Sequence, residues 1–137
     1  MDTCIFCKIA RKEIPSAIVY EDAHAFAFLD ISPVSEGHVI VIPKEHAEKI
    51  HQLSEQASNG LISAIKKVSK AAESAFKTGF NLLNNNGKEA GQAVFHVHFH
   101  IIPRRGLKDE FKYEWPSKKL EHQEQIVAEL KKALAQT

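Results

Sequence analysis

The sequence predicts an α+β fold: an antiparallel sheet of roughly five strands, one long central helix and a C-terminal helix. Three observations carry this prediction. Short apolar segments suited to strands recur in the first third of the chain, residues 54–79 have helical spacing, and residues 96–102 alternate between polar and apolar side chains. Strands and one long helix in this order are typical of α+β proteins, and 137 residues suit a single domain, 1–137.

The predicted elements follow one another with short connections. Strands are expected at residues 17–21, 24–29, 38–42, 80–83 and 95–102, and helices at 44–50, between Ser54 and Gly79, and at 118–135. The first two strands should form a hairpin, because Asp22-Ala23 between them suits a turn. Residues 38–42 are almost all apolar, which favours a central strand. Pro43 ends that strand, since proline cannot donate to a central ladder, and it also suits the first turn of the short helix.

Capping residues and periodicity predict the two longer helices. Ser54 is the expected N-cap of the central helix, and Gly79 is its expected C-terminal stop. Apolar side chains between them recur at helical spacing, at Leu61, Ile65, Val68, Ala72 and Phe76. In the C-terminal helix the side chains expected to face inward are Leu120, Val127, Leu130 and Leu134.

The composition excludes several classes of protein. With 18 basic and 17 acidic residues the formal charge is +1, so no basic field exists to hold a nucleic-acid polymer. No segment has the length and apolarity of a membrane span, and the N-terminus lacks the apolar run of a signal peptide. The only two cysteines, Cys4 and Cys7, are too few for a secreted disulfide framework. A cytoplasmic protein without a membrane partner is therefore expected.

The most informative segment is His96-Val97-His98-Phe99-His100. Period-two alternation places its three histidines on one face of the predicted strand. A polar sheet face without chemistry is the plain alternative, but imidazole is also the side chain best suited to titrate, attack or ligate near neutral pH. His96 and His100 would lie roughly 13 Å apart along a strand, so one ion cannot bind all three. A metal site and a nucleophilic histidine can therefore coexist.

Several separated motifs together resemble the histidine-triad (HIT) superfamily, most closely the bacterial HIT proteins of the Hint-like branch. The motifs are Cys4-Ile5-Phe6-Cys7-Lys8-Ile9, Phe28-Leu29-Asp30-Ile31-Ser32-Pro33, Gly37-His38, Val41-Ile42-Pro43-Lys44-Glu45-His46, Asn84-Asn85-Asn86-Gly87, Gly91-Gln92-Ala93-Val94-Phe95 and the alternating histidines. They occur in the family's order over about residues 3–105. The resemblance implies a HIT-like fold with its core in that range, an extension at 106–137, and a homodimer.

The resemblance also implies an activity. It is that of a hydrolase or transferase that cleaves a purine nucleotide at the α-phosphorus through a nucleotidyl-histidine. His98 matches the nucleophile, His100 the residue that contacts the phosphate or handles the leaving group's proton, and His38 a further active-site histidine. Expected substrates are nucleoside phosphoramidates, adenylated amines or dinucleoside polyphosphates. The alternative is a non-catalytic nucleotide sensor or a zinc-braced interaction protein.

The nucleotide-binding residues implied by the resemblance lie in three segments. Asp30 resembles the acceptor for both ribose hydroxyls, which suits a carboxylate because each oxygen can take one donor. The phosphate is expected against the loop before the triad, held by the Asn85 amide and by the backbone N–H groups of Gly91, Gln92 and Ala93. The family often has Ser or Thr where this chain has Ala93, so no hydroxyl is available there. The base is expected in an apolar slot of Ile5, Phe6, Ile9, Phe28 and Ile31, which could equally be ordinary core.

The Cys4-x-x-Cys7 pair is half of a zinc site, with two free thiols as the alternative. The resemblance implies that His46 and His96 complete a structural Cys2His2 site for Zn²⁺. All four ligand positions would then be filled, which leaves none for substrate. The zinc would brace the N-terminal segment against the triad strand and would not perform the chemistry.

Overall fold

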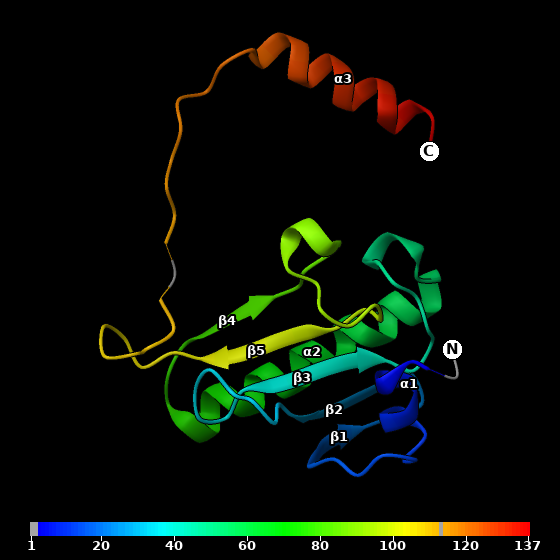
Figure 1. Ribbon diagram of the computed structural model, residues 1–137, viewed down its shortest axis with the longest axis vertical. Coiled ribbons are helices and arrows are strands. Elements are labelled where there is room, and N and C mark those ends of the chain that lie inside the picture. Colours follow the sequence, from blue (N-terminus) through cyan, green and yellow to red (C-terminus); the bar gives the residue numbers. More distant parts are fainter. Residues whose placement is uncertain (1–2, 113) are drawn as a thin grey trace.

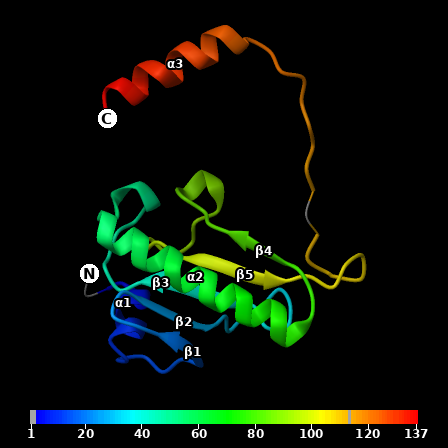
Figure 2. The same ribbon diagram turned by 180° about the vertical axis from the view of Figure 1, so that it is seen from behind.

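The computed structural model describes residues 3–112 and 114–137, in which a five-stranded sheet packs against one long helix (Figures 1 and 2). The strands are β1 (Ile18–Glu21), β2 (Ala25–Leu29), β3 (Val39–Pro43), β4 (Phe80–Leu83) and β5 (Phe99–Pro103); the helices are α1 (Ile5–Ala10), α2 (Glu55–Phe76) and α3 (Gln123–Ala135), with short 3-10 turns η1 (Ile50–Gln52) and η2 (Lys88–Ala90). The strand order is β1-β2-β3-β5-β4, and all neighbours are antiparallel. The predicted fold class is confirmed.

The apolar strand β3 is central, as predicted, and its side chains are buried on both faces of the sheet. Val39 and Val41 belong to the core cluster that includes the inward face of α2. Ile40 and Ile42 belong to a second cluster on the opposite face, which α1 helps to cover through Phe6 and Ile9. Burial on both faces accounts for the lack of alternation in this strand. No helix in the described part of the chain has the length and apolarity to span a membrane.

The long helix α2 begins as predicted and ends early. The Ser54 side chain caps it by accepting a hydrogen bond from the N–H of Ala57 at 3.1 Å. At the other end Lys77 adopts the left-handed conformation (φ 53°), and its N–H donates to the carbonyl of Glu73 at 2.8 Å. The expected stop at Gly79 is therefore wrong, because a lysine takes the capping conformation that glycine usually supplies.

The expected short helix at residues 44–50 does not form. Its backbone is held by partners elsewhere in the chain, since the carbonyl of Ala47 accepts from the N–H of Val97 at 2.8 Å. The Glu45 carboxylate accepts from the backbone N–H and the hydroxyl of Ser54, at 2.8 and 2.9 Å. Only the short turn η1 follows. In this arrangement His46 faces α1, with its Nδ1 3.3 Å from the Sγ of Cys7.

The last strand begins later than predicted. β5 starts at Phe99, and His96 and His98 lie in the irregular segment that leads into it. The expected alternation nevertheless persists across the boundary, because Val97, Phe99 and Ile101 all enter the core that α2 covers. The histidines between them therefore face away from that core.

The C-terminal helix differs most from prediction. α3 starts at Gln123 instead of residue 118, because His122 before it adopts a left-handed conformation (φ 57°). The side chains expected to face inward, Leu120, Val127, Leu130 and Leu134, are 69%, 42%, 60% and 70% exposed. Both views show α3 apart from the sheet, at the end of an extended connection (Figures 1 and 2). Its apolar side chains recur at helical spacing, but none of them is buried against the described part of the chain.

Candidate functional site

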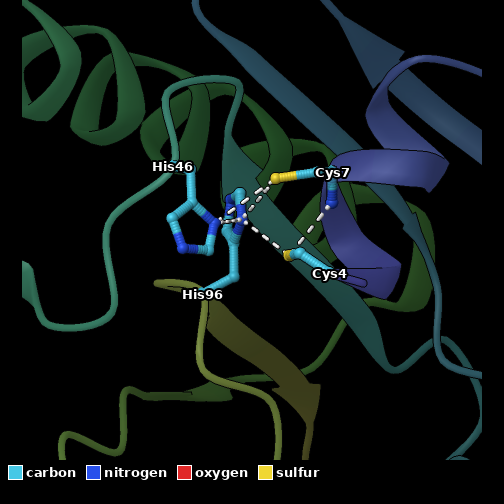
Figure 3. Close-up of side chains that lie close together, drawn as sticks. All are labelled: Cys4, Cys7, His46 and His96. Carbon is cyan, nitrogen blue, oxygen red and sulfur yellow. Dashed lines mark hydrogen bonds between the residues drawn. The ribbon is translucent and has the colours of Figure 1, made fainter. Parts of the chain in front are cut away.

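The triad histidines divide between two clusters of donor atoms. His96 joins Cys4, Cys7 and His46, whose ligand atoms all lie within 4.8 Å of one another (Figure 3). His100 joins Asp30 and His38 in a second cluster. His98 lies between them, with its ring centroid 5.1 Å from that of His100.

The first cluster could hold a metal ion. The Nδ1 atom of His96 is 3.4 Å from Cys4 Sγ, 3.5 Å from Cys7 Sγ and 3.2 Å from His46 Nδ1. The Nε2–H of His96 donates to the carbonyl of Pro43 at 2.9 Å, so its lone pair is on Nδ1 and faces the sulfur atoms. In metal sites, the nitrogen of a histidine that does not bind the metal usually donates to a carboxylate, a backbone carbonyl or water, as the Nε2 of His96 does here. Two thiols and two imidazoles are the donors of a tetrahedral site.

Burial sets the protonation of this cluster. His96 is fully buried, which lowers its pKa to about 4, helped by the nearby charges of His46 and His98. Burial also raises the pKa of the Cys7 thiol to about 11, and the hydrogen bond and charge of Cys4 act in the same direction. A metal that binds here therefore meets a neutral imidazole and has to displace thiol protons.

His98 is held in one tautomer by the backbone. Its Nδ1–H donates to the carbonyl of His96 at 2.7 Å, so the lone pair is on Nε2. The Nδ2 of Asn84 donates to the carbonyl of His98 at 2.8 Å and fixes the backbone of this residue. Burial lowers the pKa of His98 below 6.5, against the opposing effects of its backbone hydrogen bond and of Asp30. The ring is therefore neutral at pH 7 with an available nitrogen.

A pocket of about 400 Å³ opens beside His98 and His100. Its walls include the expected base-slot residues Ile5, Phe6, Ile9, Phe28 and Ile31, together with Asp30, Gly91 and Ala93. The Oδ2 atom of Asp30 lies 3.5 Å from Nε2 of His38, and its Oδ1 accepts from the N–H of Ser32 at 2.8 Å. An apolar pocket with a few converging polar groups is typical of a small-molecule site.

Sequence reasoning missed part of this pocket. The further lining residues are Ile14, Pro15, Ser16, Leu29, Ile40 and Val94. Residues 14–16 follow α1, a helix that was not predicted; its one local signal is Cys4, whose sulfur caps it by accepting from the N–H of Cys7 at 3.3 Å. Ile40 pairs with the pocket residue Phe28 in the neighbouring strand β2 and lies in the same core cluster.

The phosphate loop needs one correction. The N–H of Gly91 donates to the carbonyl of Lys88 at 3.0 Å, and that of Gln92 donates to the carbonyl of Gly87 at 3.1 Å. Both groups are thus used within the loop, and among the three expected donors only the N–H of Ala93 lacks an acceptor in the described residues. These internal bonds close the turn η2 and hold the loop in shape.

Two residues expected at the phosphate do not line the pocket. The Gln92 side chain is buried and braces the loop through bonds to the N–H of Gly87 and to the carbonyls of Glu48 and Val94. Asn85 is also absent from the pocket wall, and its Nδ2 lies 3.8 Å from the point where Gly91 would carry a Cβ. The neighbouring Asn84, which sequence analysis did not single out, supports His98 instead.

Comparison with known proteins gives a consistent result. The HIT domain family profile matches residues 11–107. The chain is 50% identical over 115 residues to Protein hit of Bacillus subtilis, which covers 83% of this chain and 79% of the relative. It is 47% identical over 115 residues to adenosine 5'-monophosphoramidase hnt1 of Schizosaccharomyces pombe, which covers 84% of each chain.

Solved structures agree with the sequence matches. A HIT family member from Bacillus subtilis superimposes with a TM-score of 0.88 at 45% identity, covering 95% of this chain and 96% of the other. SMU.412c from Streptococcus mutans superimposes with a TM-score of 0.91 at 39% identity, covering 98% of this chain and 87% of the other. Sequence and fold agree, and the chain belongs to the HIT domain family.

Proposed function

We propose that the protein is a purine nucleotide hydrolase or transferase that cleaves at the α-phosphorus through a nucleotidyl-His98 intermediate. The observation that carries this proposal is the fixed tautomer of His98, whose Nδ1–H is bonded to the backbone 2.7 Å away and whose Nε2 is left to attack. His98 also lines the pocket that contains Asp30. The Schizosaccharomyces pombe relative is named an adenosine 5'-monophosphoramidase, which supports a nucleotide substrate.

The pocket suggests how a nucleotide would bind. The purine would lie among the apolar side chains of Ile5, Phe6, Ile9, Phe28 and Ile31, where any purine can pack. Both ribose hydroxyls would donate to Asp30, which lines the same pocket and has its Oδ2 3.5 Å from the Nε2 of His38. The α-phosphate would then lie against His98 and the N–H of Ala93, with Asn85 as a side-chain donor if the loop adjusts. One backbone N–H stabilises the negative charge on the phosphate in the transition state less than the three expected N–H donors would.

The chemistry proceeds in two displacements. The Nε2 of His98 attacks the α-phosphorus, the new P–N bond forms, and the bond to the leaving group breaks. A water molecule then attacks the same phosphorus, the P–N bond breaks, and the nucleoside monophosphate leaves. The Nε2–H of neutral His100 would donate a hydrogen bond to the departing group in the first step, with His38 behind it. The proton that an amine gains would come from the bound substrate or from solvent, and the proton that water loses in the second step would return to solvent.

This proposal covers three candidate substrate classes. Nucleoside phosphoramidates and adenylated amines lose an amine, which departs only when it gains a proton. Dinucleoside polyphosphates lose a good anion but need room for a second nucleotide. Since Ala93 supplies no hydroxyl, His100 would be the side chain that donates a hydrogen bond to a departing amine.

We also propose that the cluster of Cys4, Cys7, His46 and His96 binds a structural Zn²⁺. Its thiol and imidazole donors suit zinc, which would brace the N-terminal segment against the histidine segment and supply no group to the reaction. Two free thiols are the alternative. We further propose a homodimer in the cytoplasm, with the single domain divided into a core up to about residue 105 and an extension at 106–137.

Mass spectrometry of the intact protein tests the nucleophile. The parent chain, the His98→Ala variant and a control His51→Ala variant, altered at an exposed histidine outside the site, are mixed with adenosine phosphoramidate or diadenosine tetraphosphate. A mass gain of one AMP is expected in the parent and in His51→Ala, but not in His98→Ala. If folded, metal-replete parent protein releases no AMP from either compound, the enzyme proposal is wrong and a nucleotide sensor or interaction protein becomes the better account.

A further inference from the structure

The backbone ladder between β4 and β5 ends just before it reaches the proposed nucleophile. At its far end the N–H of Arg104 donates to the carbonyl of Gly79 at 2.8 Å, so these two opposite residues form a hydrogen-bonded pair. In an antiparallel ladder every second pair is bonded in this way. The register therefore makes Leu83 and His100 a hydrogen-bonded pair as well, and Leu83 is the last residue of β4.

The carbonyl of His98 receives a side-chain donor where the ladder would have supplied a backbone donor. The next hydrogen-bonded pair in the register would be Asn85 and His98, with the N–H of Asn85 donating to that carbonyl. The chain leaves the sheet after β4, and the Nδ2 of Asn84 donates to the carbonyl of His98 instead, at 2.8 Å (Figure 1). A side-chain amide thus continues the ladder by one bond, at the residue proposed to attack.

A second asparagine determines which way the amide of Asn84 faces. The N–H of Ile50 donates to the Oδ1 of Asn86 at 2.8 Å, and a backbone N–H can only donate, so the Nδ2 of Asn86 lies on the other side. There it donates to the Oδ1 of Asn84. The Nδ2 of Asn84 is then directed at the carbonyl of His98, which can only accept. A backbone donor at one end and a backbone acceptor at the other therefore fix the orientation of both amides.

The donor end of this amide pair belongs to residues 43–50, which hold the histidine segment at two further points. The carbonyl of Pro43 accepts from the ring of His96 at 2.9 Å, and the carbonyl of Ala47 accepts from the N–H of Val97 at 2.8 Å. These two bonds act on the residues before the nucleophile. The amide pair acts on the nucleophile's own carbonyl.

We propose that Asn84 and Asn86 are positioning residues for the attack by His98, a role that rests on the proposed function. The ring of His98 is bonded to the backbone of its own segment through Nδ1, so a shift of this backbone moves the attacking Nε2 with it. Neither asparagine is among the residues that line the pocket, so both act through His98 and not through contact with the substrate. A displacement of about 1 Å can slow a reaction roughly 10²-fold.

Single variants test this role by separating the rate of attack from nucleotide binding. The rate at which the AMP adduct appears is measured by rapid quench and intact mass after mixing with adenosine phosphoramidate, and the dissociation constant of AMP is measured by calorimetry. Asn84→Ala removes the donor to His98 and should slow adduct formation about 10- to 100-fold while AMP binds as tightly as to the parent. Asn86→Asp still accepts from Ile50 but offers Asn84 only oxygen, so the amide of Asn84 turns toward it, and the adduct should form about 2- to 12-fold more slowly. The same two substitutions at Asn59, exposed on α2, are the controls and should change either quantity by at most about twofold.

A double variant separates a connected pair from two independent disturbances of the loop. Since Asn86 acts through Asn84, the double variant Asn84→Ala/Asn86→Asp should form the adduct as fast as Asn84→Ala alone, whereas independent losses would multiply. Circular dichroism shows whether each variant is folded at the assay temperature, and Asn86→Asp carries the test if Asn84→Ala does not fold. Hydrogen exchange of the Asn84 side-chain amide, followed by NMR, should be slow in the parent and faster in Asn86→Asp, whatever the activity.

Three results would overturn the positioning role. They are adduct formation at the parent's rate in the folded variants, a loss of AMP affinity as large as the loss of rate, and losses that multiply in the double variant. If the parent itself forms no adduct, the proposed function fails together with this role. If the parent forms the adduct and the variants form it equally fast, only the positioning role fails.

Discussion

The Nε2 of His38 lies 2.8 Å from the Nδ1 of His100, and the backbone fixes the direction of this hydrogen bond. The N–H of Val34 donates to the Nδ1 of His38 at 3.2 Å, so that nitrogen holds a lone pair and the ring proton is on Nε2. His38 therefore donates to His100, and neutral His100 carries its own proton on Nε2. A metal ion bound among Asp30, His38 and His100 would have to displace the proton on the Nε2 of His38. We therefore interpret this cluster as a set of hydrogen-bonded side chains and not as a metal site.

His38 and His100 are both neutral at pH 7. Burial lowers the pKa of His100 to about 4, and the nearby charges of His98 and His38 act in the same direction. Burial also lowers the pKa of His38, although Asp30 opposes the shift. With its proton on Nε2, neutral His100 can donate a hydrogen bond to a leaving group on which charge develops.

The first prediction concerns His38 as the residue that sets the tautomer of His100. His38→Ala should lower kcat for a phosphoramidate about 10²-fold, a loss typical for a positioned hydrogen-bond donor to the reacting group, with a much smaller effect on KM. His38→Gln should restore most of kcat, because the glutamine amide can also donate to His100. A dinucleoside polyphosphate, whose leaving group needs no proton, should lose less. Equal losses in both variants and with both substrates would contradict a positioning role.

A second prediction concerns the acid limb of the pH profile. His98 attacks only when its Nε2 is unprotonated, so kcat/KM should rise with pH as this ring loses its proton. Because burial lowers the pKa of His98, the midpoint of the rise should lie below the ordinary value of 6.5. Steady-state kinetics between pH 4 and pH 8 measure it, with unfolding followed by circular dichroism in the same buffers. A midpoint at or above pH 6.5 would contradict a desolvated nucleophile.

For the histidine segment, the sequence predicts which side chains face the core, but it does not predict where the strand begins. Alternation places Val97 and Ile101 in the core and His98 outside it, because burial requires only that apolar side chains share one face. It does not show where the ladder begins, since that depends on a distant acceptor, the carbonyl of Ala47, which binds the N–H of Val97. The expected helix at 44–50 is wrong for the same reason.

In the candidate site too, the sequence predicts residue types but not the hydrogen-bond partners of the backbone. The residue types at Asp30, His38 and His98 are visible in the sequence, and the structure brings them to one pocket or its edge. The occupancy of backbone donors is not visible, and two of the three N–H groups expected at the phosphate are used inside their own loop. Periodicity predicts apolar spacing at Val127, Leu130 and Leu134, but it cannot show whether the rest of the chain offers these side chains a surface to pack on, and α3 has no buried residue.

The third prediction tests Asp30 as the ribose acceptor. Asp30→Asn keeps an Oδ1 that can accept from the N–H of Ser32, so the turn should be retained while the carboxylate is lost. A hydrogen bond to a charged group is worth about 1.5–3 kcal/mol, so kcat/KM for a ribonucleotide substrate should fall roughly 10- to 100-fold. A substrate without ribose hydroxyls should be hydrolysed at nearly the same rate by parent and variant. An equal loss with both substrates would place Asp30 in another role, such as support of His38.

The last prediction concerns the metal cluster. Cys7→Ser and His46→Ala each remove one of four converging donors, so metal bound per purified chain should fall from about one to well below one by elemental analysis. Asp30→Asn, altered in the other cluster, is the matched control and should retain the metal. Chelation of the parent should lower its melting temperature, because a ligand that binds only the folded state stabilises it. The nucleotidyl-His98 adduct should still form in chelated protein kept below its melting temperature, since the ion only braces the segment that carries His96. Full metal content in both cluster variants would show that the two thiols are free; loss of the adduct in folded, metal-free protein would show that the ion takes part in the reaction.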